Sequence, residues 1–389
     1  MHKQRAISRT VLLLSLVSLF TDISSEMLYP VMPLYLKEIG FTVAAIGVLE
    51  GVAEAVAGLS KGYFGTWSDN IGVRMPFVRW GYGLSALSKP MMAAFSYAWW
   101  IFLARTIDRT GKGLRTGARD AILSDEATLQ IKATVFGFHR SMNTAGAMIG
   151  PSFALLFLYF YPARYKSLFV WALLPGIVAI FITFLIKEKK SAAVKHKEYP
   201  SFKAFYQYWL KAPAAYKKLT GALLAFALFN SSDVLLLLRI KETGRSDNTL
   251  IAVYIFYNAV YAILAYPVGI LADKTSLKKI FTMGLLLFAI VYAGMCVEGS
   301  TYWYLLLFFL YGIYAAATEG ISKAWITKLV AKEKVATAVG TYTGFQSIAT
   351  LLASSIAGLL WFYFGATTTF ILSAIVTLLV LIYIYFKTE

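Results

Sequence analysis

The chain has 389 residues, of which 59% are hydrophobic and 15% are charged, and its formal net charge is +17. A soluble domain of this length carries about a quarter charged residues, so the composition excludes a water-soluble globular protein. The basic side chains gather in a few segments between apolar runs, and this distribution argues against a nucleic-acid-binding surface.

The apolar runs are long enough to cross a bilayer as helices. About 20 helical residues span the ~30 Å of hydrocarbon, and the strands of a β-barrel would be half as long and alternate in polarity. We therefore predict an all-α membrane protein with twelve transmembrane helices. The predicted spans are 10–36, 43–64, 75–95, 98–118, 133–160, 167–186, 219–240, 249–272, 279–297, 301–326, 336–364 and 367–386.

The first two spans carry pairs of carboxylates one helical turn apart. Asp22 and Glu26 lie in the first span, and Glu50 and Glu54 lie in the second. A charge at the centre of a membrane helix costs about 2.5–3.5 kcal/mol, so such a residue normally faces a cavity and has a partner. A carboxyl group there can take up and release a proton as its surroundings change. We predict proton coupling through Asp22, Glu26 and Glu54, with Asp22 as the first candidate.

The second span ends in a loop with a distinctive spacing, Gly65-Thr-Trp-Ser-Asp69 followed by Gly72 and Arg74. A glycine at a helix end lets a neighbouring helix pack closely. Asp69 can accept hydrogen bonds from a helix N-terminus or pair with Arg74. These residues are predicted to form a conformational latch, and a static loop anchor is the alternative.

The fourth span carries a stripe of charges. At about 100° per residue its six charged residues fall within roughly 120° of one another. Arginine suits a bidentate contact with a carboxylate or phosphate, so the basic residues are candidates for anion binding and the single acid is a candidate proton carrier. Alternatively, the charges are ion pairs that hold the bundle together. The stripe consists of Arg105, Asp108, Arg109, Lys112, Arg115 and Arg119, and the substrate-binding candidates among them are Arg105, Arg109 and Lys112.

The fifth span adds two polar candidates, and a basic linker follows the sixth. Arg140 and Asn143 are predicted to bind substrate. Residues 190–217 form a Lys-rich and aromatic cytoplasmic linker, a pattern typical of a short helix lying on anionic headgroups. The linker separates an N-terminal six-helix bundle (1–189) from a C-terminal one (218–389).

The second half repeats features of the first with fewer charges. Gly269 and Asp273, followed by Ser276 and Lys278, copy the spacing of the loop motif. Such a repeat in so hydrophobic a chain indicates two pseudo-symmetric membrane halves around a central cavity. Most Tyr and Phe side chains are predicted to face lipid or the membrane interface. The candidates in this half are Asn230, Asn258 and Gln346 for substrate binding, and Asp233 and Glu319 for proton coupling.

These motifs resemble those of the major facilitator superfamily. The loop motif and its copy match the family's loops between helices two and three and between helices eight and nine. Arg109-x-x-x-Gly113 resembles the family's arginine motif, and Gly146-x-x-x-Gly150-Pro151 resembles the motif of its antiporters. A narrower pattern around Asp22–Pro30 and Asp108–Asp120 is similar to a poorly characterised group of bacterial permeases. The resemblance covers the whole chain and implies the twelve-helix fold and secondary transport.

The distribution of Lys and Arg predicts the orientation in the membrane. The N-terminus, the segment 187–218 and the loops near 274–279 and 328–334 are basic, whereas the alternate loops around Ser96, Glu298 and Gly365 have almost no Lys or Arg. Basic loops stay cytoplasmic. We predict a multi-pass protein of the cell inner (cytoplasmic) membrane with both termini inside and an uncleaved first span.

The chemistry of the chain favours transport over catalysis. Gly111-Lys112-Gly113 lacks the spacing of a phosphate loop, and His2, His139 and His196 are too dispersed for a metal cluster. We expect no enzyme activity, catalytic residue, cofactor or metal. The leading hypothesis is a monomeric transporter that moves a small organic anion, of the carboxylate-metabolite or siderophore type, by proton-coupled alternating access. Its partners would be that substrate, protons and membrane lipids. Proton-driven multidrug efflux, lipid flipping and a non-transporting sensor are the alternatives.

Overall fold

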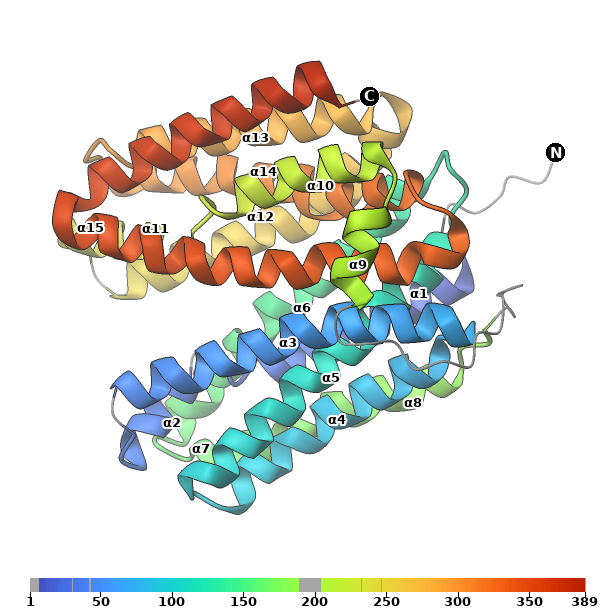
Figure 1. Ribbon diagram of the computed structural model, residues 1–389. Coiled ribbons are helices and arrows are strands. Elements are labelled where there is room, and N and C mark those ends of the chain that lie inside the picture. Colours follow the sequence, from blue (N-terminus) through green and yellow to red (C-terminus); the bar gives the residue numbers. More distant parts are fainter. Residues whose placement is uncertain are drawn as a thin grey trace. The chain divides into compact units, whose positions relative to one another are not determined.

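The computed structural model describes residues 7–29, 31–41, 43–188, 204–231, 233–245 and 247–388, and this part of the chain is helical throughout apart from short turns and loops (Figure 1). The elements are α1 (Arg9–Glu26), α2 (Met32–Glu38), α3 (Val43–Ile71), α4 (Met75–Ala94), α5 (Ala98–Asp125), α6 (Lys132–Phe160), α7 (Tyr165–Trp171), α8 (Leu173–Phe184), α9 (Ala204–Lys211), α10 (Ala214–Ala227), α11 (Asp233–Glu242), α12 (Asp247–Lys274), α13 (Leu277–Gly294), α14 (Thr301–Lys328), the 3₁₀ turn η1 (Lys332–Lys334) and α15 (Val335–Lys387).

Each predicted span is found as one helix, as two consecutive helices, or as part of α15. The helix α15 contains the last two spans, because Gly365 has a φ of 83° and interrupts the helical backbone. In Figure 1 the chain folds back on itself within α15. The all-helical, twelve-span prediction is confirmed. The helices α3 and α5 continue to Ile71 and Asp125, past the predicted ends, because the hydropathy of a run marks its apolar part and not its polar last turns.

Six helical stretches among the described residues have the length and apolarity that a membrane span needs. Four of them correspond to α6, α12, α13 and α14, one to α7 with α8, and one to α15 with η1. The helix α5 is long enough but carries the charged stripe, which lowers its mean hydropathy. So many charged side chains on one membrane helix need partners inside the protein.

Two spans are interrupted at corresponding points of the two halves. The first breaks between Glu26 and Met32, and the seventh breaks between Ala227 and Asp233. Carboxylates stand at both interruptions, Glu26 at the first and Asp233 at the second. Discontinuous helices at matching places in a repeated membrane fold are typical of a binding region.

The chain forms two compact units. Unit 1 comprises residues 1–127, 142–211 and 330–347, and unit 2 comprises residues 128–141, 212–329 and 348–389. Each unit thus contains a short segment from the sequence half that supplies most of the other unit, namely 330–347 in unit 1 and 128–141 in unit 2. Segment 330–347 includes the first turn of α15, which the loop motif contacts. Segment 128–141 includes the first turn of α6, which the copy of the motif contacts.

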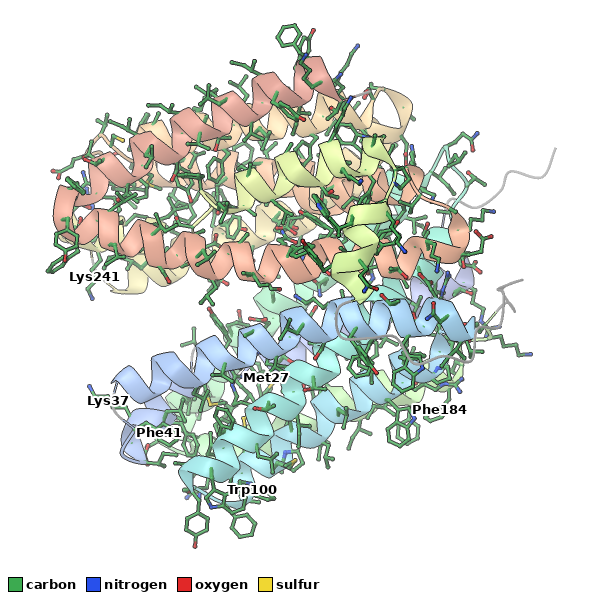
Figure 2. The ribbon with its side chains drawn as sticks, viewed as in Figure 1. Met27, Lys37, Phe41, Trp100, Phe184 and Lys241 are labelled. Atoms are coloured by element: carbon green, nitrogen blue, oxygen red, sulfur yellow. The ribbon has the colours of Figure 1, made fainter. Side chains whose placement is uncertain are left out.

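The core of unit 1 lies where α1 passes into α2. Met27, labelled in Figure 2, is buried with Tyr35 of α2, Met92 of α4 and Phe169 of α7. The Tyr35 and Phe169 rings meet edge-on with their centroids 4.9 Å apart. This packing holds the interrupted span against its neighbours.

Exposed aromatic side chains lie near helix ends in unit 1. Phe184, near the end of α8 (Figure 2), is mostly exposed, and the Arg79 guanidinium lies 5.1 Å from its ring centroid. Trp99 and Tyr97, at the start of α5, are also mostly exposed. Aromatic residues in such places are typical of membrane interfaces.

The linker contains the helix α9, within the predicted 190–217 segment. Its Trp209 ring meets the Phe345 ring edge-on at 5.8 Å, and α9 packs against α3. Residues 189–203 lie outside the described residues, and the interfacial role of the linker stays a prediction.

Candidate functional site

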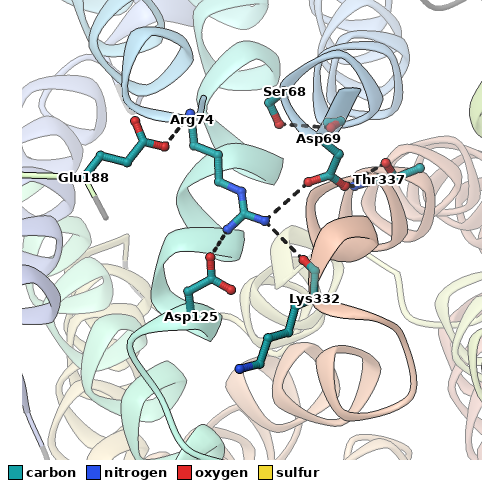
Figure 3. A network of polar contacts seen from close by, with 8 residues as sticks. Ser68, Asp69, Arg74, Asp125, Glu188, Lys332 and Thr337 are labelled. Atoms are coloured by element: carbon teal, nitrogen blue, oxygen red, sulfur yellow. Dashed lines mark hydrogen bonds and ion pairs between the residues drawn. The ribbon is translucent and has the colours of Figure 1, made fainter. Parts of the chain in front are cut away.

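Asp69 joins the end of α3 to the start of α15 within unit 1. The residue is 5% exposed, and its Oδ2 accepts hydrogen bonds from the Thr337 backbone N–H at 2.7 Å and from Thr337 Oγ1 at 2.8 Å. A carboxylate at the first turn of a helix neutralises unsatisfied N–H groups and the positive end of the helix dipole. Asp69 therefore caps α15 (Figure 3).

Arg74 organises the rest of this cluster. Its guanidinium pairs with Asp69 at 3.5 Å and with Asp125 at the end of α5, and it donates to the Lys332 carbonyl at 3.2 Å. Its backbone N–H donates to Glu188 Oε1 at 2.6 Å. Figure 3 shows these contacts converging from α3, α5, the start of α15 and the residues after α8. One arginine thus connects four segments of unit 1.

The glycines of the loop motif have separate structural roles. A Cβ on Gly65 would lie 2.5 Å from the Ala336 carbonyl oxygen, and a Cβ on Gly340 would collide with the Lys61 carbonyl, so α3 and α15 touch backbone to backbone. Gly72, with a φ of 70°, ends α3 in a left-handed conformation that favours glycine. Sequence reasoning identified Gly65 and Gly72 but not Gly340.

Burial works against the charge of Asp69. Asp69 lies beyond the predicted span 43–64, and its pKa is raised to about 6 by desolvation, although Arg74 and the Thr337 hydrogen bonds act in the opposite direction. The donors around Asp69 therefore offset only part of the cost of burying the carboxylate.

The copy of the motif makes the same kind of contact within unit 2. Asp273 Oδ1 and Oδ2 accept hydrogen bonds from the backbone N–H groups of Ala133 and Thr134, at 3.1 and 2.6 Å, in the first turn of α6. A Cβ on Gly269 would lie 2.5 Å from the Ala133 carbonyl oxygen. The cation beside Asp273 is Lys328 at 3.6 Å, whereas Lys278, which matches Arg74 in the repeat, donates to the Thr388 carbonyl.

Three charged residues of the stripe on α5, Arg105, Asp108 and Arg115, are buried, and two of them contact α4. Lys89 of α4 is 2% exposed, and its Nζ lies 2.9 Å from Asp108 Oδ1. Arg105 is also buried and lies 4.0 Å from Asp108 Oδ2. Arg115 donates to Ser85 Oγ at 2.6 Å. For these three residues of α5, the contacts agree with the interpretation that the charges are structural ion pairs.

Two other bases of the stripe are more accessible and lie near the acids of α1. Lys112 is exposed and Arg109 is half-buried. Both lie within electrostatic reach of Glu26, and Lys112 also of Asp22. Asp22 Oδ2 is buried and has no hydrogen-bond partner among the described residues. Arg115 also lies within electrostatic reach of Asp22, so the acids of α1 lie near the bases of α5.

Two glycines of α6 bring that helix against the same stretch of α1. A Cβ on Gly146 would lie 2.6 Å from the Leu19 carbonyl oxygen, and one on Gly150 would lie 2.7 Å from the Ile23 carbonyl oxygen. Asn143, one turn earlier, donates to Ser18 Oγ at 3.2 Å. The antiporter-like motif therefore serves, in this chain, as the packing surface for the helix that carries Asp22 and Glu26.

In unit 2, three tyrosines meet the interruption between α10 and α11. Asn230 Nδ2 donates to Tyr314 OH at 3.0 Å, and Tyr311 OH donates to Asp233 Oδ1 at 2.7 Å. The Ser231 and Tyr292 hydroxyls lie 3.3 Å apart. All three tyrosines are buried, so the prediction that Tyr side chains mostly face lipid fails here. Their hydroxyls contact the polar side chains at the interruption.

Two of the remaining predicted residues pair with each other, and the others lie apart from them. Arg140 of α6 pairs with Glu319 of α14 at 3.6 Å and donates to Tyr261 OH in unit 2. Asn258 donates to the Tyr254 carbonyl of its own helix at 3.0 Å. Gln346 is half-buried and belongs to unit 1. The side chain of Glu54 lies outside the described residues.

Two groups of residues escaped the sequence analysis. Lys89 is a lone cation in an apolar run, and its partner lies in another span. Two tyrosines of α14, Tyr311 and Tyr314, are spaced three apart, which places them on one helical face. That spacing indicates that the two side chains share one environment, but it does not show whether they face lipid or the protein core.

The family follows from comparison with known sequences. A model of the Major Facilitator Superfamily matches residues 14–240 and 219–389. The chain belongs to this superfamily. It is 32% identical over 368 residues to an uncharacterised MFS-type transporter of Methanocaldococcus jannaschii, a match that covers 92% of this chain and 90% of the relative. It is 22% identical over 323 residues to the multidrug resistance efflux pump PmrA of Streptococcus pneumoniae, covering 80% and 79%.

Solved structures of superfamily members share the fold. The human organic anion transporter MFSD10 matches with a TM-score of 0.81 and 15% identity, covering 97% of this chain and 99% of the other. The proton:xylose symporter XylE matches with a TM-score of 0.77 and 14% identity, covering 98% and 95%. The superfamily and these neighbours are transporters and not enzymes, and the chain is a multi-pass membrane protein. At such identities the likeness extends to the fold and not to the substrate.

Proposed function

We propose that this protein is a secondary active transporter that moves a small organic anion, of the carboxylate type, across the cell inner membrane with protons. The observation that carries the proposal is the position of two accessible bases of α5. Arg109 and Lys112 lie within electrostatic reach of Glu26 on α1. Arg and Lys there can bind a carboxylate, and nearby acids can hold a proton. We propose that it acts as a monomer.

The charges suggest how a proton and an anion travel together. When Asp22 and Glu26 are ionised, they neutralise the bases on α5 and compete with an anionic substrate. When Asp22 takes up a proton, the bases attract the anion more strongly. Release of the proton restores the pairing and weakens anion binding. Alternating access, in which two six-helix bundles rock about the site, would expose these steps to opposite sides of the membrane.

The proposed binding of an anion by Arg109 and Lys112 is tested by two substitutions. Arg109→Lys keeps the charge but loses the planar fork, so affinity for an organic anion should fall roughly tenfold. Lys112→Ala should lower that affinity by a similar factor while leaving the melting temperature nearly unchanged, because Lys112 is exposed. Binding is measured by thermal shift of the purified protein against a panel of organic anions.

Lys37→Ala is the matched control, since Lys37 is an exposed lysine on α2 (Figure 2) and not on α5. It should leave anion affinity unchanged. Melting of the Lys112→Ala variant would favour a structural ion pair, and transport of cations alone would contradict the anion site.

We also propose that Asp69 forms a latch that must close and open in each cycle. Asp69→Asn removes a charge-assisted contact worth on the order of 1.5–3 kcal/mol and should slow turnover several-fold at normal expression. Asp273→Asn should slow it less, because Arg74, which ties Asp69 to Asp125 and to Lys332, has no arginine counterpart beside Asp273. Initial transport rates in proteoliposomes distinguish the latch from a static anchor. A wild-type rate in the Asp69→Asn variant would favour the static anchor.

The proposed orientation places both termini and the linker in the cytoplasm. A reporter that is active only in the periplasm, fused after Glu389, should be silent, and the same reporter inserted at Ser96, between α4 and α5, should be active. A strong signal from the C-terminal fusion would contradict the orientation.

Proton-driven efflux of cationic amphipathic compounds is the second candidate. PmrA, a relative described as a multidrug resistance efflux pump, supports it. So does unit 2, where Asp233 and Glu319 lie near buried tyrosines, because aromatic faces and carboxylates attract organic cations. Cationic dyes in the same thermal-shift panel separate this candidate from the first.

A further inference from the structure

A groove runs between α10 and the last part of α15 in unit 2. Its volume is about 310 Å³, and its walls come from both helices. One end carries Lys217 and Lys218 of α10 and Tyr383 of α15, and the other end carries Ala225 and Val376. The start of α10 and the end of α15 lie on the same side of the unit (Figure 1), so the groove is basic and aromatic at one end and apolar at the other.

The groove has the dimensions and surface of a site for one hydrocarbon chain. From Lys217 to Ala225 the helix rises about 12 Å, at ~1.5 Å per residue. Leu379, on the wall, is 61% exposed, so apolar surface faces outward along the groove. Tyrosine and lysine are the residues that mark the membrane–water interface. The polar end therefore lies where lipid headgroups lie.

The floor of the groove is open because α10 carries a glycine there. A Cβ on Gly221 would meet nothing within 4 Å, whereas one on Gly65 or Gly269 would collide with a neighbouring backbone. Close packing of helices therefore does not explain the space at Gly221. A larger side chain would occupy the groove without disturbing the helices around it.

We propose that this groove binds an anionic phospholipid of the leaflet on the linker side. The phosphate lies at Lys217 and Lys218, and an acyl chain follows the apolar wall toward Val376. Charge complementarity selects an anionic lipid over a zwitterionic one, because paired lysines attract a headgroup with net negative charge. The site is separate from the residues proposed to bind substrate, so it does not depend on the direction or chemistry of transport.

The test uses the full-length protein in detergent with phosphatidylglycerol or phosphatidylcholine of matched chains. Native mass spectrometry should show one phosphatidylglycerol retained more tightly than phosphatidylcholine. Lys217→Gln with Lys218→Gln should weaken that retention roughly tenfold or more. Gly221→Leu should block it by filling the groove. Lys274→Gln with Lys279→Gln removes the same charge from exposed lysines outside the groove and should leave retention unchanged.

Three results would overturn the proposal. Equal loss in the two double-lysine variants would show that general surface charge, and not the groove, holds the lipid. Equal retention of the two lipids, abolished by Gly221→Leu alone, would show an apolar occupant such as detergent. Unchanged phosphatidylglycerol retention in the Lys217→Gln, Lys218→Gln protein would exclude this site even if the Gly221 variant failed to fold.

Discussion

Asp22→Asn is expected to abolish accumulation of substrate against a gradient while exchange of substrate across the membrane continues. Asp22 is half-buried on α1, its buried Oδ2 has no hydrogen-bond partner among the described residues, and Glu26, Arg115 and Lys112 lie within electrostatic reach. The amide cannot take up the proton but keeps the size of the carboxyl group. Exchange needs the conformational cycle and not proton release, so it should persist.

The measurement uses proteoliposomes with an imposed pH gradient. For one proton moved with each singly charged anion, two pH units support roughly a hundredfold accumulation, since each tenfold corresponds to about 1.4 kcal/mol. The Asp22→Asn protein should reach no accumulation under the same gradient. Glu26→Gln and Glu54→Gln are the companion variants. If all three still concentrate substrate, proton coupling through these carboxylates is wrong, and a uniporter or another ion accounts better for transport.

Lys89→Met is expected to destabilise the protein strongly. The variant leaves the Asp108 carboxylate buried without the ammonium group that lies 2.9 Å away. Removing one partner of a buried ion pair costs about 3–5 kcal/mol, and Arg105, at 4.0 Å, can compensate for part of this. The midpoint of thermal or denaturant unfolding in detergent should fall accordingly.

The double variant Lys89→Met, Asp108→Asn separates charge from packing. It removes the unpaired carboxylate and should recover more than half of the lost stability, because two neutral side chains tolerate burial better than one charge. A Lys89→Met protein of normal stability that no longer transports would contradict the structural role and place Lys89 in the transport pathway.

Much of the fold follows from the sequence alone. Hydropathy located all twelve spans, because each must present about 20 apolar residues to lipid wherever its neighbours lie. The spacing shared by Gly65–Arg74 and Gly269–Lys278 indicated two related halves and an aspartate poised to accept hydrogen bonds from a helix N-terminus. Both Asp69 and Asp273 make that contact, although the helix that each of them caps lies far away in the sequence.

Tertiary structure decided which charges are paired. Helical periodicity placed Arg105, Asp108 and Lys112 on one face of α5, but it could not tell that Asp108 pairs with a residue of α4 whereas Lys112 is exposed. It also gave no reason to connect Lys89 with Asp108, or Tyr311 with Asp233. The period of a helix determines the direction of a side chain about its own axis. What that side chain meets depends on how helices distant in sequence pack, and in this chain that packing rests on backbone contacts at glycines such as Gly65 and Gly340.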